Sequence, residues 1–364
     1  MKLPSKINEL LKSCENCGRC KRVCPFLDTY GTPDKIISET PEKVFFCTNC
    51  KACDTVCKEK LNPSDALFEM KSHLLRSGTY PLEVRNALHS ASGYAMRGHK
   101  QPFVYYSFAD TVFWPGCGLA GTSPELVKKT VQLLSGHLNK QVGLVLDCCF
   151  DPLYQLGDVN SVKEATERIH NRLEKHKITH LITGCTNCRK TLSRYLPDRK
   201  VEHILEVLPE KVINPSFLNN PSVSSFVKRG GGEFYLHHPC PSFKFDAIRE
   251  HTKKMLQATN NENPRPSCCG HGGGLRSLSP ELSEKFTDKV VKSSKGKPVV
   301  TYCMGCKGEF LEKGQKAYHV LELLTGVKPI EKPVSSGKKW VNRFFLASGQ
   351  KFNIKKLISA QRDI

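Results

Sequence analysis

The stretch Thr179-His-Leu-Ile-Thr-Gly-Cys-Thr-Asn-Cys188 joins a short apolar run to a Cys-x2-Cys pair. The same arrangement returns as Pro298-Val-Val-Thr-Tyr-Cys-Met-Gly-Cys306. A short apolar run of this kind predicts a buried strand, and open α/β sheets bind their ligands outside the carboxyl ends of the strands. The stretch therefore predicts an α/β sheet with paired sulfur ligands at its ligand-binding edge.

These two stretches close the copies of an internal repeat. In the first copy the apolar run Thr111–Trp114 leads to Cys117, and in the second Glu233–Leu236 leads to Cys240. A helical segment follows each single cysteine, and an adjacent pair of cysteines comes before the closing strand. Alternating strands and helices imply a parallel sheet with right-handed crossovers. We expect two pseudo-repeated, Rossmann-like α/β halves.

All eighteen cysteines of the 364-residue chain fall into metal-ligand patterns. Each copy of the repeat has a single cysteine, an adjacent pair and a Cys-x2-Cys pair, namely Cys117, Cys148, Cys149, Cys185 and Cys188, then Cys240, Cys268, Cys269, Cys303 and Cys306. The N-terminal part has two ferredoxin-type runs, namely Cys14, Cys17, Cys20 and Cys24, then Cys47, Cys50, Cys53 and Cys57. In a reducing cytoplasm, cysteines at this density more often bind metal than form disulfides.

The ferredoxin-type runs predict two [4Fe-4S] cubane clusters. Three thiolates of each cluster come from one run and the fourth comes from the other. This rule assigns Cys57 to the cluster of the first run and Cys24 to the cluster of the second run. Zinc is the alternative metal for Cys-x2-Cys pairs, but two complete four-cysteine runs favour iron.

The ten cysteines of the repeat resemble the signature of the CCG cysteine-rich domains in the heterodisulfide reductase family. In the first copy 30 residues separate Cys117 from Cys148 and 35 separate Cys149 from Cys185, and the second copy has 27 and 33. The resemblance covers residues 1–326, and every signature position is cysteine. It implies a non-cubane four-iron cluster in each set, with the two clusters facing each other across the substrate site. Structural zinc in one set is the alternative.

The chain is expected to have six parts. Three carry the clusters, namely a mainly helical two-cluster ferredoxin-like module (residues 1–80), the first cysteine-rich repeat (111–213) and the second (233–330). Three connect or flank them, namely a short helix with a linker (81–110), a Pro-, Ser- and Gly-rich hinge (214–232) and a basic tail (331–364). The apolar element Trp340–Leu346 in the tail either docks on a partner or packs on the body.

Three histidines lie beside cysteines of the second copy and are candidate catalytic residues. His237 and His238 precede Cys240, and His271 follows Cys269. Each has the chemistry to protonate a leaving thiolate, and a hydrogen bond that tunes a cluster is equally compatible. Two further histidines, His203 and His319, recur in predicted helices of the two copies and are expected to be structural.

The glycine run Gly270–Gly274 follows the adjacent cysteines of the second copy. It lacks the G-x-G-x-x-G order of a dinucleotide-binding loop. Glycines also allow a backbone to approach a neighbouring group closely. We therefore expect a close approach to a cluster at this run.

The formal charge of +20 is typical of proteins that bind nucleic acid or an anionic surface. Bound clusters reduce it, because an oxidised cubane with its thiolates carries a charge of roughly −2. The sequence shows no basic helix with interleaved aromatics, so a zinc-dependent nucleic-acid binder is the least favoured function. We find no apolar run of membrane-spanning or signal-peptide length. We expect a cytoplasmic protein, at most peripheral on the inner face of the membrane through a partner.

The resemblance implies an iron-sulfur oxidoreductase subunit that passes electrons from the cubanes to the paired clusters. There it would reduce a disulfide of the CoB-CoM heterodisulfide type, and basic residues would hold an anionic substrate. No flavin or nicotinamide fingerprint occurs, so a redox partner is required, either a flavoprotein or a membrane cytochrome. The alternative is an electron-relay subunit of a flavin-dependent glycolate, lactate or glycerol-3-phosphate dehydrogenase, which has a similar architecture.

Overall fold

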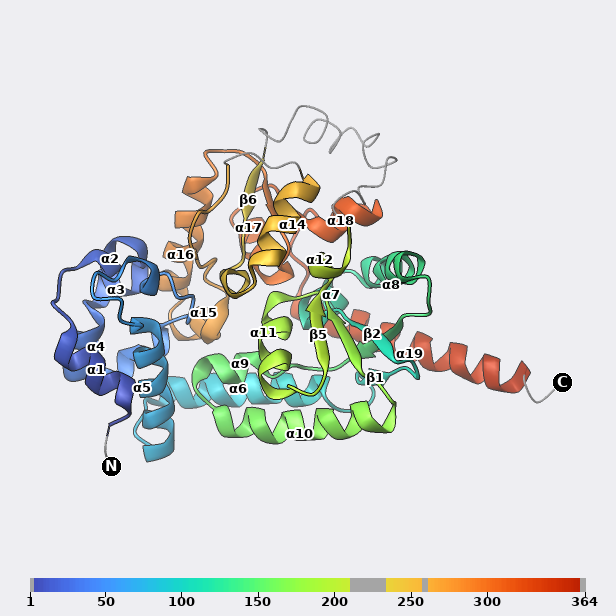
Figure 1. Ribbon diagram of the computed structural model, residues 1–364, viewed down its shortest axis with the longest axis horizontal. Helices are drawn as coiled ribbons and strands as arrows, with labels where there is room; N and C mark the ends of the chain where they lie inside the picture. The colour runs from blue at the N-terminus through green and yellow to red at the C-terminus, as the bar shows by residue number, and fades with distance from the viewer. Residues whose placement is uncertain (1–2, 210–233, 257–260, 361–364) are drawn as a thin grey trace.

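A computed structural model describes residues 3–209, 234–256 and 261–360, with side chains described as far as residue 349. It is a mixed α/β structure with two sheets surrounded by helices (Figure 1). The predicted hinge, residues 214–232, lies outside the described residues. No helix in the described part of the chain has the length and apolar character needed to cross a membrane.

The N-terminal part is built from short helices. They are α1 (Ser5–Ser13), α2 (Arg19–Val23), α3 (Pro25–Tyr30), α4 (Pro33–Glu39), the 3-10 helices η1 (Pro41–Phe46) and η2 (Asp54–Val56), α5 (Pro63–Ser77) and α6 (Leu82–Gly98). Helix α5 begins with proline and is capped at its C-terminus by Gly78 in the left-handed conformation. The helix predicted in the linker is longer than expected, since α6 has 17 residues.

The first sheet contains strands β1 (Tyr105–Tyr106), β2 (Thr111–Trp114), β3 (Gly143–Leu146), β4 (His180–Thr183) and β5 (Lys200–His203). Their order is β1-β3-β2-β4-β5, in which β2 to β5 are parallel and β1 pairs antiparallel with β3 at the edge. The strands β2 and β3 are buried along their whole length, as parallel strands covered on both faces are. The strands predicted before Cys117 and Cys185 are confirmed, and β1 was not predicted.

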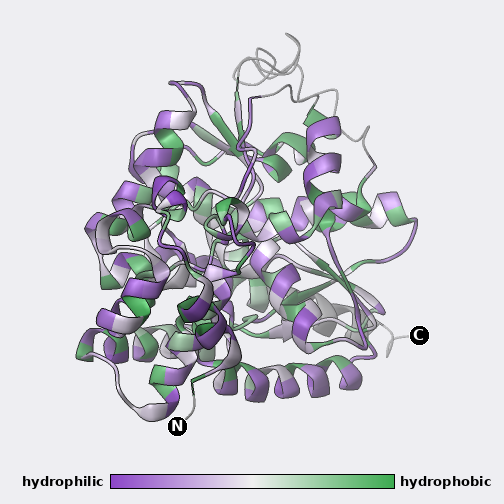
Figure 2. Cartoon of the chain, turned by 60° about the vertical axis from the view of Figure 1, so that its left-hand side comes forward, coloured by the Kyte–Doolittle hydropathy of each residue, from purple (hydrophilic) through white to green (hydrophobic). Residues whose placement is uncertain are grey.

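Helices α7 (Gly116–Thr122), α8 (Pro124–Leu138), α9 (Asp151–Leu156), α10 (Val159–Lys175), α11 (Thr186–Tyr195) and α12 (Ile204–Val207) belong to this repeat. Figure 2 shows hydrophilic and hydrophobic bands alternating along the outer helices. On α10 the apolar positions Val162, Ile169 and Leu173 are buried at helical spacing. The apolar stripe of each such helix therefore packs inward and its polar face meets solvent.

The second sheet contains strands β6 (Tyr235–His237), β7 (Val299–Thr301) and β8 (Ala317–His319), all parallel and in that order. Its helical elements are η4 (Cys240–Lys244), α14 (Asp246–Leu256), η5 (Gly272–Gly274), α15 (Leu275–Leu278), α16 (Pro280–Ser293), α17 (Met304–Glu312) and α18 (Val320–Thr325). The strand predicted to begin at Glu233 is described from Tyr235. Next to β6, an isolated parallel bridge joins Leu236 to Glu262, on the chain segment that leads to the adjacent cysteines.

One hydrophobic core runs through both repeats. It contains Phe113 and Ile182 from the first sheet, and Leu236 and Tyr302 from the second repeat, all buried. Because these side chains pack in a single cluster, the two repeats share this part of their hydrophobic core.

The tail forms a long helix, α19 (Ser336–Ala360), whose far end extends beyond the body in Figure 1. Its first part packs on α7. The ring of Trp340 lies 4.8 Å from that of Phe103 and 5.1 Å from that of Tyr94, centroid to centroid. Of the two roles expected for the apolar element Trp340–Leu346, the structure therefore shows packing on the body.

The two repeats agree in side-chain detail where helices α12 and α18 begin. Leu205 N donates to Nδ1 of His203 at 3.3 Å, and Leu321 N donates to Nδ1 of His319 at 3.2 Å. Both histidines therefore have the expected structural role, although they lie at the N-caps and not inside the helices.

A charge pair accompanies each cap. The capping glutamate of α18, Glu322, accepts from Lys307 at 2.5 and 2.6 Å, and both side chains are buried. In the first repeat Glu206 accepts from Arg189 at 2.8 Å. Arg189 and Lys307 each follow the second cysteine of a Cys-x2-Cys pair. These two ion pairs thus connect each Cys-x2-Cys motif to the helix that follows the next strand.

The capping histidines predict a pH dependence of stability. Burial lowers the pKa of both His203 and His319 to about 3, below the value of about 6.5 expected in the unfolded chain. The unfolded chain therefore binds more protons between these values, so stability is complete above about pH 6.5 and falls as the pH drops towards 3. Each histidine should contribute a loss approaching about 1.4 kcal/mol per pH unit in this window. Anaerobic urea unfolding between pH 7.5 and 5.5 measures it.

The double variant His203→Asn, His319→Asn keeps a good capping residue at both helices and removes both titrations. Its stability is expected to vary less with pH than that of the wild type. His89 is exposed on α6, so His89→Asn should retain the wild-type slope. An equal slope in the wild type and the double variant would show that the caps do not carry the effect.

Candidate iron-sulfur sites

The first group of ferredoxin cysteines lines one cavity. Cys14, Cys17, Cys20 and Cys57 all face it, together with apolar groups such as Leu10 and Leu61. Burial raises the pKa of Cys20, and the neighbouring thiols of Cys17 and Cys57 raise it further. Four thiols that converge on one cavity form a donor set that fits a cubane.

The second group is more deeply buried. Burial raises the pKa of Cys53 well above its usual value, and Asp54, Cys47, Cys50 and Cys24 raise it further. Cys24 therefore lies with the second run, as the ferredoxin rule assigns it. Burial also raises the pKa of Cys24 itself, to about 12. Negative iron-bound thiolates in this setting need stabilisation from cations or hydrogen bonds.

The five cysteines of the first repeat converge at the carboxyl ends of the strands. Cys117 lies on α7, Cys148 and Cys149 follow β3, and Cys185 and Cys188 begin α11. The sulfur atoms of Cys188 and Cys149 are 3.3 Å apart. Gly116 has a φ of +79°, and a Cβ there would lie 3.0 Å from the Cβ of Cys185. The donor set fits a metal body that all five sulfurs surround.

The adjacent cysteines are accommodated by the same bend in both repeats. Phe150, after Cys149, has a φ of 59°, and Gly270, after Cys269, has a φ of 86°. Phe150 N donates to the sulfur of Cys148 at 3.4 Å, and Gly270 N donates to that of Cys268 at 3.3 Å. A left-handed residue at this point turns the chain back, so both sulfurs of each pair can face one site.

The second set converges in the same way. The neighbouring thiol of Cys268 is the largest cause that raises the pKa of Cys240, and the thiol of Cys269 is the largest cause that raises that of Cys306. Cys303 and Cys306 begin α17, as Cys185 and Cys188 begin α11. The structure thus brings together all ten cysteines predicted in the repeats, in two groups of five.

The two groups of five meet at a seam. Contact with Cys303 raises the pKa of Cys185, and contact with Cys185 is the largest cause that lowers the pKa of Cys303. A Cβ at Gly118 of α7 would lie 3.4 Å from the Cβ of Met304 on α17, so the two helices approach closely beside the cysteines. The first cysteines of the two Cys-x2-Cys pairs therefore face each other.

The second group of five also adjoins the ferredoxin cysteines. The thiol of Cys268 raises the pKa of Cys24, Cys47 and Cys50, and Cys50 raises that of Cys240. The four donor sets therefore form a series, from the first ferredoxin group to the second, then to the second repeat and the first.

The glycine run lies at this junction. A Cβ at Gly273 would lie 3.3 Å from the carbonyl oxygen of Cys47, and one at Gly272 would lie 2.7 Å from Oε1 of Gln155. The run therefore closely approaches the loop that carries Cys47 and a side chain of the first repeat, and its approach to a cluster stays a prediction.

Lys71, which no sequence motif singled out, joins the same parts. Its buried ammonium donates to the carbonyl oxygens of Cys47 at 2.5 Å and Gln155 at 3.0 Å. Burial lowers the pKa of Lys71 to about 8. A mid-helix lysine on α5 carries no sequence signal of such a role.

The three candidate histidines lie in different surroundings. His237 is fully buried, has no hydrogen-bond partner among the described residues, and has its pKa lowered to about 3 by burial. His238 is held on both sides, with Nδ1 2.8 Å from the hydroxyl of Tyr302 and Nε2 2.8 Å from Glu262. Neither ring is accessible from solvent, since His237 is 0% and His238 is 1% exposed.

His271 differs from the other two because its side chain is 59% exposed. Its Nδ1 lies 2.9 Å from Glu309, which also accepts from Arg276 at 3.0 Å. A Cβ at Gly305 would lie 2.8 Å from its ring, so His271 sits over the start of α17, beside the seam. It therefore has a carboxylate to orient it and an accessible ring near the cysteines.

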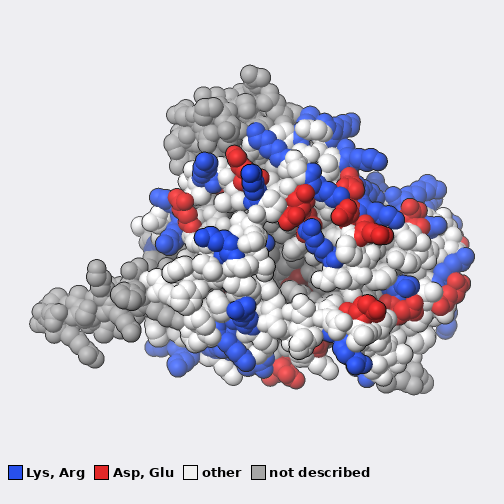
Figure 3. All heavy atoms as spheres, turned by 180° about the vertical axis from the view of Figure 1, so that it is seen from behind, with Lys and Arg blue, Asp and Glu red and all other residues white. Residues whose placement is uncertain are grey.

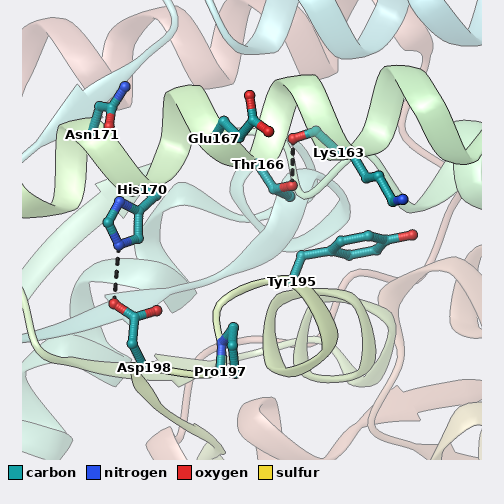
Figure 4. A pocket seen from close by; sticks show the side chains of 8 residues that line it. All are labelled: Lys163, Thr166, Glu167, His170, Asn171, Tyr195, Pro197 and Asp198. Carbon is teal, nitrogen blue, oxygen red and sulfur yellow. Dashed lines mark hydrogen bonds and ion pairs between the residues drawn. The ribbon is translucent and has the colours of Figure 1, made fainter.

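A cavity of about 410 Å³ between α10 and the end of α11 lies apart from these sites (Figure 4). No cysteine lines it. His170 is 3.0 Å from Asp198, and Glu174 completes a group of possible metal ligands. Arg199 already pairs with both carboxylates, so their charge is compensated without a metal.

Comparisons with known proteins agree with this arrangement. The 4Fe-4S dicluster domain family matches residues 6–58, and the cysteine-rich domain family, CCG, matches residues 111–193 and 234–310. The chain is therefore an iron-sulfur protein that joins a ferredoxin-type dicluster module to paired CCG domains. These matches agree with the resemblance to heterodisulfide reductase that the cysteine spacing predicts.

Named relatives come from methanogenic archaea. One component of the fumarate reductase (CoM/CoB) of Methanothermobacter marburgensis is 23% identical over 86% of this chain and 72% of its own length. One component of the dihydromethanophenazine:CoB–CoM heterodisulfide reductase of Methanosarcina mazei is 22% identical over 78% of this chain and 83% of its own. An uncharacterized iron-sulfur protein of Methanococcus maripaludis is 23% identical over 87% of this chain, which spans 58% of that protein.

Proposed function

We propose that the chain is a disulfide-reducing subunit that passes electrons from two [4Fe-4S] cubanes to two non-cubane four-iron clusters. The observation that supports this proposal is the contact between Cys185 and Cys303, one cysteine from each five-cysteine set. Each half is taken as a Rossmann-like repeat, with its ligands at the carboxyl ends of parallel strands. When bound, the clusters supply one-electron steps and iron that binds sulfur.

The reaction consumes two electrons and two protons for each disulfide and releases two thiols. We propose that a chain residue supplies these protons near the seam. His271 is our candidate for this role, because Glu309 lies beside its Nδ1 and the ring remains accessible. Thiol exchange through a free protein dithiol is disfavoured, since all eighteen cysteines belong to the four donor sets.

Basic residues near Cys240 support an anionic disulfide as the substrate. Lys190 pairs with Asp151 at 2.8 Å, and both Asp151 and Cys240 contribute to raising the pKa of Lys190. The pKa of Lys244, on the same short helix as Cys240, is lowered to about 8 by burial and by the cations Lys51, Arg194 and Lys190. Such mutually repelling cations gain stability when an anion binds among them.

A redox partner would deliver electrons at the first cubane, since Cys17 is exposed. A flavoprotein or a membrane cytochrome fits the absence of a flavin or nicotinamide fingerprint from the sequence. A partner of the second kind would hold the chain at the inner face of the membrane. Sequence similarity to components of heterodisulfide reductase favours disulfide reduction over an electron relay. On the face shown in Figure 3, Lys and Arg are interspersed with Asp and Glu, which does not favour nucleic-acid binding.

The test is an assay of the anaerobically isolated chain with a reduced viologen dye and the CoB-CoM heterodisulfide. We expect about sixteen irons per chain, four in each donor set, and dye oxidation that depends on the disulfide. A fully iron-loaded chain that never oxidises the dye with this substrate would instead be an electron relay. Stoichiometric zinc in a five-cysteine set would show that this set holds no redox cluster.

A further inference from the structure

Helix α19 lies against the helix that carries the first ligand of the first five-cysteine set. Asn342 donates to the carbonyl oxygen of Gly121 on α7 at 2.7 Å. A Cβ at Gly121 would lie 3.0 Å from that of Lys339, so the two helices pack closely. Both α19 and the linker helix α6 lie outside the residues that match the two domain families. The first five-cysteine set therefore has neighbouring helices that do not belong to its cysteine-rich domain.

Arg343 points from α19 into this contact and is only 3% exposed. Its guanidinium carbon is 4.4 Å from the ring centroid of Trp340 and 5.9 Å from that of Tyr94. A Cβ at Gly98 of α6 would lie 2.5 Å from Nη2, so glycine there leaves the guanidinium its space. Nη1 has no hydrogen-bond partner, and no carboxylate pairs with Arg343, anywhere in residues 3–209, 234–256 or 261–349.

A buried guanidinium without an anion is strongly unfavourable, and arginine does not lose its charge in proteins. The neighbouring anionic groups are thiols of the first set and the carboxylate of Asp147, which pairs with Arg172. Burial lowers the pKa of Arg343, but Cys117, Tyr94, Cys148 and Asp147 together raise it above its ordinary value. Helix α19 packs on α7, which carries Cys117, so the permanent positive charge of Arg343 lies beside the first set.

The second set has neighbours of both charges, because Lys190 lies near Cys240. Its cysteines adjoin Cys24, Cys47 and Cys50 of the second ferredoxin group, where the proposed cubane would bring negative charge. Net charge near an iron-sulfur cluster is one of the terms that set its reduction potential. A cation raises the potential and an added negative charge lowers it, and the buried arginine of the described residues, Arg343, lies beside the first set.

We propose that Arg343 is a positioning residue that raises the reduction potential of the first set, so that electrons from the cubanes are drawn towards it. This inference rests on the proposed function, because it requires a redox cluster in both sets. It gives the series of donor sets a direction, and it assigns a task to the helix that follows the second repeat.

The test is an EPR-monitored redox titration of the anaerobically isolated, iron-loaded chain, in the wild type and in Arg343→Gln. We expect the midpoint potential of the first set to fall by at least 59 mV, which is a tenfold change for a one-electron couple. The second set and the cubanes should keep their potentials. Arg343→Lys retains the charge and should stay closer to the wild type. Arg97 stacks on the same ring of Trp340 from an exposed position, so Arg97→Gln is the matched control and should shift the potential far less.

The contrary outcomes are distinct. An unchanged potential in an iron-loaded Arg343→Gln variant would overturn the inference and leave the proposed function standing. If Arg343→Gln loses the iron of its first set, the Arg343→Lys variant decides between charge and packing. Retention of that iron in Arg343→Lys supports a role of the charge. Loss in both variants would show that packing alone matters and would also overturn it. A wild-type chain with no iron in the first set would refute the proposed function itself.

Discussion

Replacing Cys303 with serine is expected to remove about four irons from each chain and to lower disulfide reduction more than a hundredfold. Cys303 is one of the five sulfurs of the second set and contacts Cys185 across the seam, so its loss affects the point where the two sets face each other. The two cubanes lie on other cysteines and should remain reducible by dithionite. Iron and sulfide analysis, EPR and the viologen assay measure these three effects.

Cys17→Ser is the positional contrast to this variant. Cys17 lines the cavity of the first ferredoxin group and is exposed. Its loss should remove the first cubane and slow electron uptake, while the spectra of both five-cysteine sets persist. If Cys303→Ser retains full activity, or if both variants lose the same spectroscopic signals, the assignment of Cys303 to a separate catalytic cluster is wrong.

His271→Gln is expected to slow disulfide reduction by a factor of about 10² to 10⁴, the usual contribution of a general acid. Reduction of the clusters by the dye should continue at the wild-type rate, because that step needs no proton at the seam. Single-turnover oxidation of the pre-reduced chain by the disulfide separates the two steps. Glu309→Gln keeps the shape of the partner and removes its charge, so a smaller loss is expected there.

Two histidine variants serve as controls for His271. His89 is exposed on α6, and His89→Gln should behave like the wild type in the turnover assay. His238 hydrogen-bonds to Tyr302 and Glu262 on its two sides, so His238→Gln should mainly lower stability. A His271→Gln chain that turns over within about twofold of the wild type would show that solvent provides the protons.

The sequence was most informative where chemistry and spacing coincide. Cysteine spacing alone grouped the ligands, including the exchange of Cys24 and Cys57 between the ferredoxin runs, and the apolar runs before Cys117, Cys185 and Cys303 predicted their strands. These signals are local, since a strand and the ligand after it lie within a few residues. The two-residue strand β1 is too short to show any periodicity, so its pairing with β3 was missed.

Contacts between distant segments carry no such signal. Arg343 is more than 200 residues from Cys117 in the sequence, and a lysine- and arginine-containing tail is typical of a solvated surface. Lys71 is likewise an ordinary lysine of an amphipathic helix until the fold buries it. The three histidines near cysteines looked equivalent, because the burial of His237 and the two hydrogen bonds of His238 depend on strands and loops far along the chain.

Lys71 and the glycine run interlock three parts of the chain at the loop that carries Cys47. Such a joint leaves the ferredoxin part little freedom to move between a partner and the seam of the two five-cysteine sets. Electrons would then tunnel over fixed gaps, and the rate of transfer would be set by driving force and not by domain motion. Turnover should accordingly be insensitive to solvent viscosity at the internal steps, and only partner docking and substrate exchange should respond to it.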